Sequence, residues 1–294
     1  MNSNQRFNTS LGRVFDVFNI IILGIIALAM LLPFIYVIAG SFATEMELST
    51  RSFFLWPREF TLDSYNYVLQ TKTILKSLFT TIGITVVGTF VQLAFTFTMA
   101  YPLSRKYLPG RTIVLNMIVF AMLFSGGMVP TFLVVKSLGL LNSYWALILP
   151  IAISPFNLMI IKNNFQSLPS ELEEAARMDG CSDIGIFWKI MLPLSKPTIA
   201  TFTLFYAVGI WNDFMSSLLY ISDSSKWPIQ LLLRQITMSS SGANALATMD
   251  STYVAPEQGI KFVVIVIATV PILLVYPFLQ KYFTKGILIG SVKG

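Results

Sequence analysis

Long runs without a charged residue constrain this chain more than any other feature of its sequence. Five runs contain no Asp, Glu, Lys or Arg, and each is about as long as the roughly 20 residues that a helix needs to cross a bilayer. A sixth run is apolar except for Asp213. The simplest fold is therefore an all-α integral membrane protein with about six transmembrane helices, at residues 18–40, 77–104, 112–135, 137–161, 197–222 and 262–280.

The composition agrees with a membrane protein. Of 294 residues, 55% are hydrophobic and only 12% are charged, and the mean hydropathy is +0.71. A soluble domain carries about twice that share of charged residues. The net charge of +6 is explained by lysine and arginine on cytoplasmic loops, so we expect no nucleic acid as a partner.

The chain lacks the residues of several kinds of active site. It has one cysteine, Cys181, and no histidine, which excludes a disulfide within the chain, Cys/His metal sites and a histidine base. No segment has the GxxxxGK[ST] spacing of a Walker A loop. We therefore expect no metal and no cofactor bound by this chain, and any ATP and Mg²⁺ must bind to another chain.

The distribution of basic residues predicts the orientation. The short segment SRKYLPGR carries three basic residues and belongs on the cytoplasmic side, which places both termini there as well. The first apolar run is longer than the core of a signal peptide, so we expect an uncleaved span. Residues 1–17 are then a cytoplasmic N-terminal segment, residues 18–286 a single transmembrane domain and residues 287–294 a cytoplasmic tail.

Three hydrophilic segments connect the predicted spans. Residues 41–76 and 223–261 lie outside. The third segment, Lys162–Lys196, lies inside between spans four and five, and we call it the internal loop. A flexible linker is the simplest interpretation of residues 223–261.

The internal loop reads as two short helices joined at a glycine. Ser170 and Glu173 have the spacing of a capping box, and Glu173 and Arg177 have the i, i+4 spacing of an ion pair. Gly180 follows the first helix, where a left-handed residue is needed. The second helix is capped by Ser182 or Asp183 and is expected to stop at Pro193.

The first of these helices has a surface suited to another protein. Leu172, Ala175, Ala176 and Asp179 share one face, and two alanines there allow a close approach to the backbone. The alternative is a connector that rests on the bilayer, but an interfacial helix is usually basic with large apolar residues. This helix instead carries several acidic residues against one Arg177. The composition favours protein docking.

A known motif covers the same residues. The internal loop reproduces the pattern EAA-x3-G-x9-I-x-L-P at every fixed position and so resembles the EAA loop of ABC importer permeases. The resemblance implies a coupling helix that sits in a cleft of a cytoplasmic ATPase subunit, with Glu174 on a basic residue of the ATPase and Gly180 at the corner. The residues expected at this contact are Glu174, Ala175, Ala176, Asp179, Gly180, Ile190, Leu192 and Pro193.

The C-terminus, TKGILIGSVKG, resembles the tail of maltose-permease-type subunits. In those relatives the tail inserts between the paired ATPase subunits, which implies the same contact for Gly290, Val292, Lys293 and Gly294. A frayed terminus is the alternative. In the same relatives the loop equivalent to residues 223–261 reaches into the sugar cleft of the binding protein.

Further stretches resemble permeases that import carbohydrates. These are AYPLSR at 100–105, MVPTFLVVKSLGLLNSYWALILP at 128–150 and WND at 211–213. The first two are most similar to the branch for complex saccharides such as pectin or alginate fragments. The resemblance implies a multi-pass subunit of the bacterial cell (inner) membrane. Its expected partners are a homologous second permease, two copies of an ABC ATPase with ATP and Mg²⁺, an extracellular solute-binding protein and a saccharide.

Polar residues inside the predicted spans are candidates for the translocation pathway. Polar side chains are costly in a membrane and usually face the interior of the helix bundle. Many of them only hold helices together, and Asp213 lies near the outer end of its span, where water can reach it. The candidates are Gln92, Asn116, Asn157, Trp211, Asn212 and Asp213.

Two other classes of protein remain as alternatives. An ion-coupled secondary carrier or a channel often has acidic residues at the middle of the membrane, and here only Asp213 lies in a predicted span. A membrane enzyme needs a catalytic set, and a chain without histidine and with few acids in its spans offers no convincing one.

Overall fold

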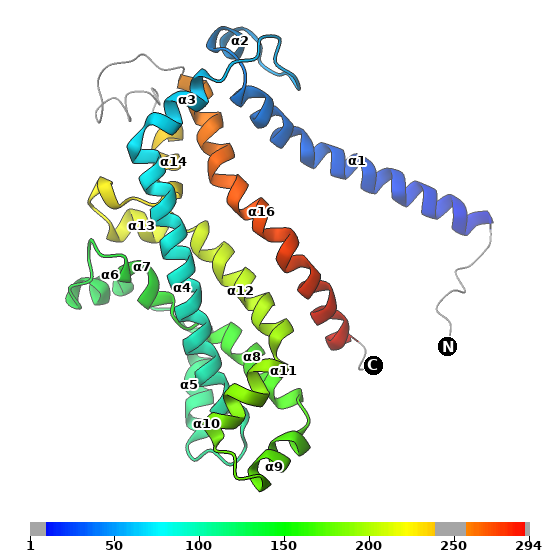
Figure 1. Cartoon of the computed structure of the whole chain (residues 1–294), viewed down its shortest axis with the longest axis vertical. Coiled ribbons are helices and arrows are strands. Elements are labelled where there is room, and N and C mark those ends of the chain that lie inside the picture. The colour runs from blue at the N-terminus through cyan, green and yellow to red at the C-terminus, as the bar shows by residue number, and fades with distance from the viewer. Residues whose placement is uncertain (1–9, 239–256, 292–294) are drawn as a thin grey trace. The chain divides into compact units, whose positions relative to one another are not determined.

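The computed structural model describes residues 10–238 and 257–291, and nearly all regular structure in these two ranges is helical. Figure 1 shows the helices in chain order. They form two compact units. Among the described residues, the first unit holds 10–71, 235–238 and 257–267, and the second holds 72–234 and 268–291.

The first unit is built from α1 (Ser10–Ser41), α2 (Glu45–Thr50), α3 (Asp63–Gln70) and the first part of α16 (Glu257–Ser291). Most of α1 exposes its apolar side chains within this unit, as expected of a helix that meets lipid or another subunit. Only the last turns of α1 join a core, which consists of Ala39, Ala43, Leu48 and Phe54 with Tyr36 and Phe262 packed against it.

Gly40 allows α1 and α16 to approach within this unit. A Cβ atom at Gly40 would lie 2.8 Å from a ring carbon of Phe262, which is closer than real Cβ contacts. The Phe262 ring also meets the Tyr36 ring edge-on, with centroids 5.4 Å apart. A larger residue at Gly40 would therefore displace an aromatic side chain of the core.

The second unit is organised around α4 (Lys72–Ser104), which packs against α8 (Pro155–Ser167) and α12 (Lys196–Trp211). Gly88 of α4 faces Ile210 of α12 with no room for a methyl group unless the isoleucine moves. The other helices of this unit are α5 (Arg111–Leu123), α6 (Met128–Ser137), α7 (Trp145–Ile148), η1 (Leu149–Ile151), α9 (Ser170–Met178), α10 (Asp183–Ile186), η2 (Phe187–Met191), α11 (Leu192–Leu194), α13 (Met215–Tyr220), η3 (Ser224–Lys226) and most of α14 (Ile229–Met238).

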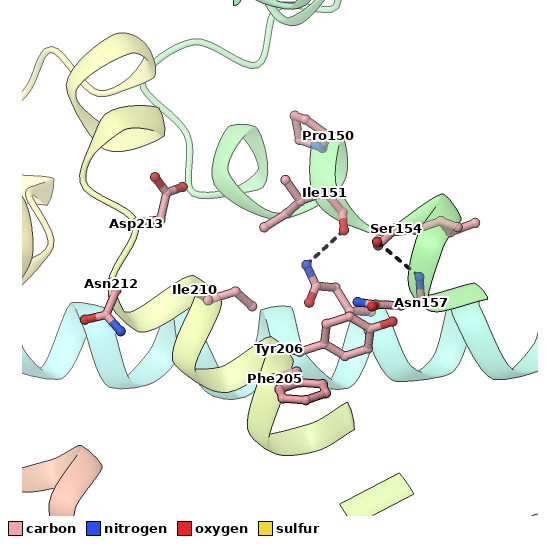
Figure 2. A pocket seen from close by; sticks show the side chains of 12 residues that line it. Pro150, Ile151, Ser154, Asn157, Phe205, Tyr206, Ile210, Asn212 and Asp213 are labelled. Atoms are coloured by element: carbon pink, nitrogen blue, oxygen red, sulfur yellow. Dashed lines mark hydrogen bonds between the residues drawn. The ribbon is translucent and has the colours of Figure 1, made fainter. Parts of the chain in front are cut away.

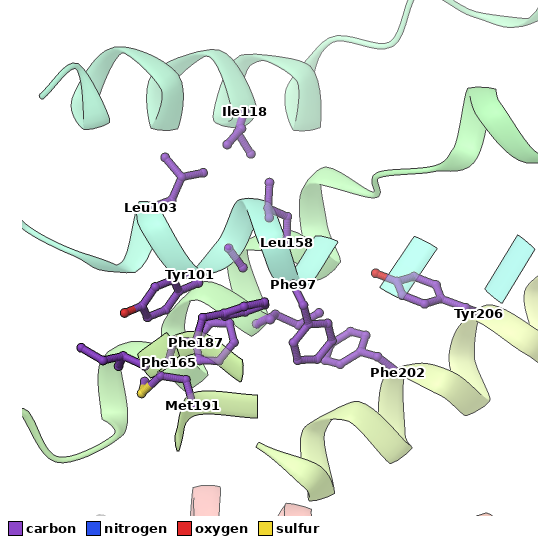
Figure 3. Close-up of a cluster of buried hydrophobic side chains, with 13 residues drawn as sticks. Phe97, Tyr101, Leu103, Ile118, Leu158, Phe165, Phe187, Met191, Phe202 and Tyr206 are labelled. Atoms are coloured by element: carbon purple, nitrogen blue, oxygen red, sulfur yellow. The ribbon is translucent and has the colours of Figure 1, made fainter. Parts of the chain in front are cut away.

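The main core of the second unit lies where α4, α8 and the internal loop meet (Figure 3). Phe165 is fully buried at its centre, and its ring packs edge-on against Phe97, Tyr101 and Phe187 at centroid distances of 5.8, 5.9 and 6.4 Å. Aromatic pairs in this geometry contribute about 0.5–1.5 kcal/mol each beyond the area they bury. The internal loop is therefore part of the core and not a free connector.

The described residues contain three helices long and apolar enough to cross a membrane, at Val14–Ser41, Lys72–Ser104 and Gln258–Val275. Two further candidates are bent pairs, α5 with α6 at 120° and α7–η1 with α8 at 54°. The predicted spans at 112–135 and 137–161 therefore each coincide with a bent pair of helices. The predicted span at 197–222 is also interrupted, because α12 ends at Trp211 and α13 begins at Met215.

The breaks have local causes. Gly127, at the bend between α5 and α6, has φ 85°, a backbone angle that residues other than glycine rarely adopt. The bend before α8 precedes Pro155, and Ser154 caps the new helix by accepting a hydrogen bond from the backbone N–H of Asn157 at 3.4 Å. Charge-free runs reveal how much chain is apolar, but a bend inside such a run depends on a few residues.

Helices extend into both predicted end segments. α1 begins at Ser10, so part of the predicted N-terminal segment is helical. α16 continues to Ser291, so the predicted tail at 287–294 is helical over its first five residues.

Candidate functional site

The corner of the internal loop has the geometry that the sequence predicts. Gly180 has φ 76°. The backbone N–H of Cys181 donates to the carbonyl of Ala176 at 2.9 Å, and the N–H of Gly180 donates to that of Arg177 at 3.0 Å. These two bonds form a Schellman motif, which ends a helix with a left-handed residue and satisfies its last carbonyls. The prediction of a left-handed Gly180 is confirmed.

The predicted capping box does not form. Pro169 occupies the N-cap position of α9, and Ser170 is already the first helical residue. Glu173 is therefore the fourth helical residue, one position too late in the helix to reach back to the cap as a capping box requires. It turns inward instead, where it is buried and forms the predicted ion pair with Arg177 at 3.0 Å.

Glu173 belongs to a group of four charged residues that we call the ionic cluster: Arg105, Glu173, Arg177 and Asp183. Arg105 at the end of α4 contacts one carboxylate oxygen of Glu173 at 2.9 Å, and Arg177 contacts the other. Arg177 also pairs with Asp183 at 2.9 Å. The cluster therefore joins α4, α9 and the start of α10 through charge-assisted hydrogen bonds.

Two tyrosines complete the surroundings of the ionic cluster. Arg105 lies over the Tyr101 ring and Arg177 over the Tyr107 ring, at 4.9 and 4.8 Å from the ring centroids. The hydrogen bond between Arg177 and the Tyr107 hydroxyl raises the pKa of Arg177 above its already high value. Arg177 is therefore always charged, and the cluster carries two positive and two negative groups.

The other side of α9 faces away from the core. Of the predicted docking face, Leu172, Ala175 and Asp179 are exposed, whereas Ala176 turns inward and packs against the core. Glu174 is exposed next to the buried Glu173. Met178 at the end of the helix is 89% exposed. α9 thus presents an acidic surface with a few apolar side chains.

The second helix of the internal loop begins as predicted but ends differently. The Ser182 hydroxyl caps α10 by accepting a hydrogen bond from the N–H of Gly185 at 3.2 Å. The prediction that the helix stops at Pro193 is wrong, because it continues to Leu194. The residues before the proline adopt a π-helix, η2, which accommodates a residue that cannot donate to the preceding turn. Ile190 and Leu192 pack against the core, and Pro193 is exposed.

A cavity of about 540 Å³ lies further along α4 (Figure 2). Gln92 forms part of its wall and donates a hydrogen bond from Nε2 to the carbonyl of Ile151 at 2.8 Å. Its Oε1 atom is buried without a hydrogen-bond partner among the described residues. The lining residues are Gln92, Pro150, Ile151, Ile153, Ser154, Asn157, Phe205, Tyr206, Gly209, Ile210, Asn212 and Asp213.

The cavity lining mixes amides, a carboxylate and aromatic rings. Asp213 is the one charged residue among the lining residues, and its carboxylate accepts a hydrogen bond from the N–H of Ser216 in the first turn of α13 at 3.1 Å. Tyr206 shares a hydrogen bond with Thr96 at 3.1 Å between the two hydroxyl oxygens. Amide and carboxylate groups together with aromatic faces match the hydroxyls and the apolar faces of sugars.

Four of the six predicted pathway residues meet at this cavity: Gln92, Asn157, Asn212 and Asp213. The other two do not. Trp211 is buried and donates from its indole Nε1 to the carbonyl of Ala268 at 3.0 Å, which is a packing role. Asn116 is exposed on α5 and is not among the lining residues.

Sequence reasoning missed several contributors to the two regions. Arg105 and Tyr107 lie in the basic segment SRKYLPGR, which indicated sidedness but not a partner for Glu173. Ser154 and Tyr206 line the cavity, and the Ser-Pro pair at 154–155 was an available signal for the helix break.

The four residues of the predicted C-terminal ATPase contact lie at the end of α16 or beyond the described residues. Gly290 lies in the last turn of α16, and Val292, Lys293 and Gly294 lie outside the described residues. Within the described ranges no three His, Cys, Asp or Glu residues gather in a way that would hold a metal ion.

Apolar helices of bilayer length, together with an internal loop that carries the EAA motif and packs on α4, indicate a membrane subunit of a transporter. Residues 106–289 match the family described as "Binding-protein-dependent transport system inner membrane component", and the chain belongs to this family. It is a permease subunit of an ABC importer, in which ATP hydrolysis is carried out by a separate subunit.

Individual relatives are similar over nearly the whole chain. Protein LplC of Bacillus subtilis (strain 168) is 66% identical over 98% of this chain and 97% of its own length. The polygalacturonan/rhamnogalacturonan transport system permease protein YtcP of the same organism is 57% identical over 96% of this chain and 99% of its own length.

A solved structure shares the fold. One chain of a bacterial ABC transporter involved in the import of the acidic polysaccharide alginate superposes with a TM-score of 0.87 at 34% sequence identity, over 94% of this chain and 99% of that chain. The chain therefore has an ABC permease fold.

Proposed function

We propose that this chain is one of two homologous permease subunits of an ATP-driven importer for oligosaccharides released from plant or algal polysaccharides, with pectin fragments as the substrate class. The observation that carries the substrate class is the 57% identity to a permease named for polygalacturonan and rhamnogalacturonan, which extends over 96% of this chain. The alginate transporter supports the same broad class of acidic polysaccharide fragments.

The proposed complex contains this chain, a second permease, two copies of an ABC ATPase and an extracellular solute-binding protein. This chain spans the bacterial cell membrane about six times with both termini in the cytoplasm, the broken segments at 111–137, 145–167 and 196–220 each counting as one span. ATP and Mg²⁺ bind to the ATPase subunits.

The internal loop is the proposed coupling site. The exposed acidic side of α9, with Glu174 and Asp179, fits a basic cleft of the ATPase, and Ala175 allows a close approach. Gly180 sets the angle at which the second helix leaves. Movement of the ATPase subunits during the ATP cycle would then move the internal loop and change the side on which the pathway is open.

The cavity beside α4 is the proposed part of the translocation pathway in this subunit. Gln92, Asn157, Asn212 and Asp213 offer hydrogen bonds to sugar hydroxyls, and Phe205 and Tyr206 supply aromatic faces. None of the lining residues is basic, so the carboxylates of an acidic sugar are expected to meet cationic groups of the second permease.

The first test is recovery of the complex. The tagged chain is purified from native membranes in mild detergent, and the proteins that accompany it are identified by mass spectrometry. The proposal expects an ATPase and a second permease. Recovery of this chain alone, with uptake in liposomes that needs no ATP, would instead support a secondary carrier or a channel.

The second test addresses the substrate. The complex is reconstituted in proteoliposomes with its binding protein, and uptake of trigalacturonate is compared with uptake of maltotriose in the presence of ATP or ADP. ATP-dependent uptake of trigalacturonate is expected. The variant Glu174→Gln should abolish it, whereas Glu59→Gln, an exposed glutamate of the 41–76 segment, should not. Equal uptake of maltotriose would contradict the substrate class.

A further inference from the structure

We propose that Glu173, the residue before the glutamate of the EAA motif, is a positioning residue that ties α9 to the end of α4, so that movement of the internal loop moves α4. This inference rests on the proposed function. It assigns different tasks to two neighbouring glutamates. Glu174 is exposed on the side proposed to face the ATPase, and Glu173 is buried against Arg105 at the end of α4.

The contacts of Glu173 are unusually complete for an acid on a short helix. Its side chain is 8% exposed, and that of Arg105 is 12% exposed. One carboxylate oxygen accepts from Arg105 at 2.9 Å, and the other accepts from Arg177 at 3.0 Å. The Tyr101 hydroxyl lies 3.4 Å from the same oxygen as Arg177. A pair buried to this extent is weakly screened by salt, and its geometry is fixed by several bonds at once.

The end of α4 is held on the other sides too. Arg111 donates from Nε to the carbonyl of Leu103 at 2.8 Å, and Gln166 donates from Nε2 to the carbonyl of Ser104 at 3.1 Å. These bonds fix the end of α4 to α5 and α8. The contact between Arg105 and Glu173 is the ion pair that links α4 to α9 within the described part of the chain.

α4 connects this end to the cavity. Gln92 lies 13 residues before Arg105, a distance of about 20 Å along a helix that rises 1.5 Å per residue. Pro102 lies between Arg105 and Tyr101, but the Tyr101 hydroxyl itself lies 3.4 Å from Glu173. The chain between Gln92 and Tyr101 contains no glycine or proline and is continuous helix. Thr96, between them, shares its hydrogen bond with Tyr206 of the cavity wall. A displacement of α9 therefore reaches two cavity residues through one stiff element.

Stability alone and mechanical coupling make different predictions. If Glu173 only stabilised the fold, its loss would reduce the amount of active complex, and uptake and ATP hydrolysis would fall together. If it transmits movement, the number of sugars transported per ATP hydrolysed falls while ATP hydrolysis persists. The ratio of the two rates separates these roles.

The experiment uses the complete complex with its binding protein in proteoliposomes, with trigalacturonate uptake and ATP hydrolysis measured in the same preparation. Glu173→Gln is expected to lower the number of sugars per ATP at least tenfold while the ATPase subunits remain bound. Arg105→Gln should give the same loss, and combining the two should add less than twofold. Lys106→Gln is the matched control, because it removes the same charge from the neighbouring exposed residue.

A conservative variant covers the case in which Glu173→Gln does not assemble. Arg105→Lys keeps the charge but not the planar fork of the guanidinium, so it should assemble and lose part of the ratio. A wild-type ratio in Glu173→Gln, or in both Arg105 variants, would overturn the inference and leave the proposed function intact. Absence of ATP-driven uptake in the wild-type complex would instead refute the proposed function.

Discussion

Gly180 offers a prediction with an internal control. Two helices of this chain end in the same Schellman geometry, α9 at Gly180 and α6 at Gly139, with φ 76° and 69°. At Gly139 the bonds run from Leu140 N–H to the Val135 carbonyl and from Gly139 N–H to the Lys136 carbonyl, at 3.2 and 3.0 Å. At both glycines nothing lies within 4 Å of where a Cβ atom would stand. Replacement by alanine therefore causes backbone strain without a clash at either position.

The expected cost is nearly the same for Gly180→Ala and Gly139→Ala. Left-handed strain costs about 1–2 kcal/mol for a residue with a Cβ. The lower entropy of the unfolded chain offsets about 0.4–1 kcal/mol of this. The net destabilisation is about 1 kcal/mol, which lowers the population of a correctly formed corner about fivefold if the strain is relieved locally.

The two variants should differ in coupling and not in stability. Both are expected to lower the Tm of the purified complex by a similar small amount. In proteoliposomes, Gly180→Ala should lower sugar uptake per ATP by up to about fivefold, because its corner positions the proposed coupling helix. Gly139→Ala should leave that ratio unchanged. Gly180→Asn should recover much of the loss, since asparagine tolerates the left-handed region better than alanine.

Two results would refute this reasoning. An unchanged ratio in Gly180→Ala would mean that the corner does not have to keep its angle during transport. An equal loss in Gly139→Ala would mean that the effect reports general destabilisation and not the position of the coupling helix.

Three further predictions concern stability. Phe165→Ala should cost about 3–5 kcal/mol, because it empties the centre of the aromatic core, whereas Phe156→Ala on the same helix, where the ring is 60% exposed, should cost less than about 1 kcal/mol; similar thermal unfolding of the two would contradict this. Trp211→Phe should cost about 1 kcal/mol through loss of the 3.0 Å hydrogen bond to Ala268, and no change in Tm would argue against that bond. Burial opposes ionisation of Glu47. Hydrogen bonds from the Arg58 backbone N–H and from the Arg51 side chain outweigh this effect and hold the pKa of Glu47 below 4.5. Its contribution is therefore complete above about pH 4.5 and is lost as the pH falls through the lower folded value, so Glu47→Gln should be less stable than wild type at pH 7 and equal to it at low pH.

The sequence contained enough to predict the membrane class and the corner of the internal loop. Apolar runs of bilayer length have few folds open to them, because unpaired backbone groups are costly in lipid. The left-handed position of Gly180 follows from its place just after a helix, where glycine has a specific conformational use.

The direction in which Glu173 points was not predictable from local spacing. The pattern S-x-x-E favours a capping box, but its partner in the structure is Arg105, which lies 68 residues earlier. An ion pair over that separation depends on how α4 and α9 pack, and short-range pattern reasoning does not contain that information. The orientation of Trp211 was not predictable either, because its indole donates to a backbone carbonyl of α16 and does not line the cavity.

The charges of the internal loop divide into two groups with different reach. The four members of the ionic cluster cancel one another. Glu171, Glu174 and Asp179 remain exposed on and just after α9, and none of the three is in an ion pair within the described part of the chain. An uncancelled acidic group acts over the Debye length, about 8 Å at physiological ionic strength, and so attracts a basic partner before contact is made. The buried pair of Arg105 and Glu173 is thus weakly screened by salt, whereas the attraction of the exposed acidic groups for the proposed ATPase partner falls as salt rises.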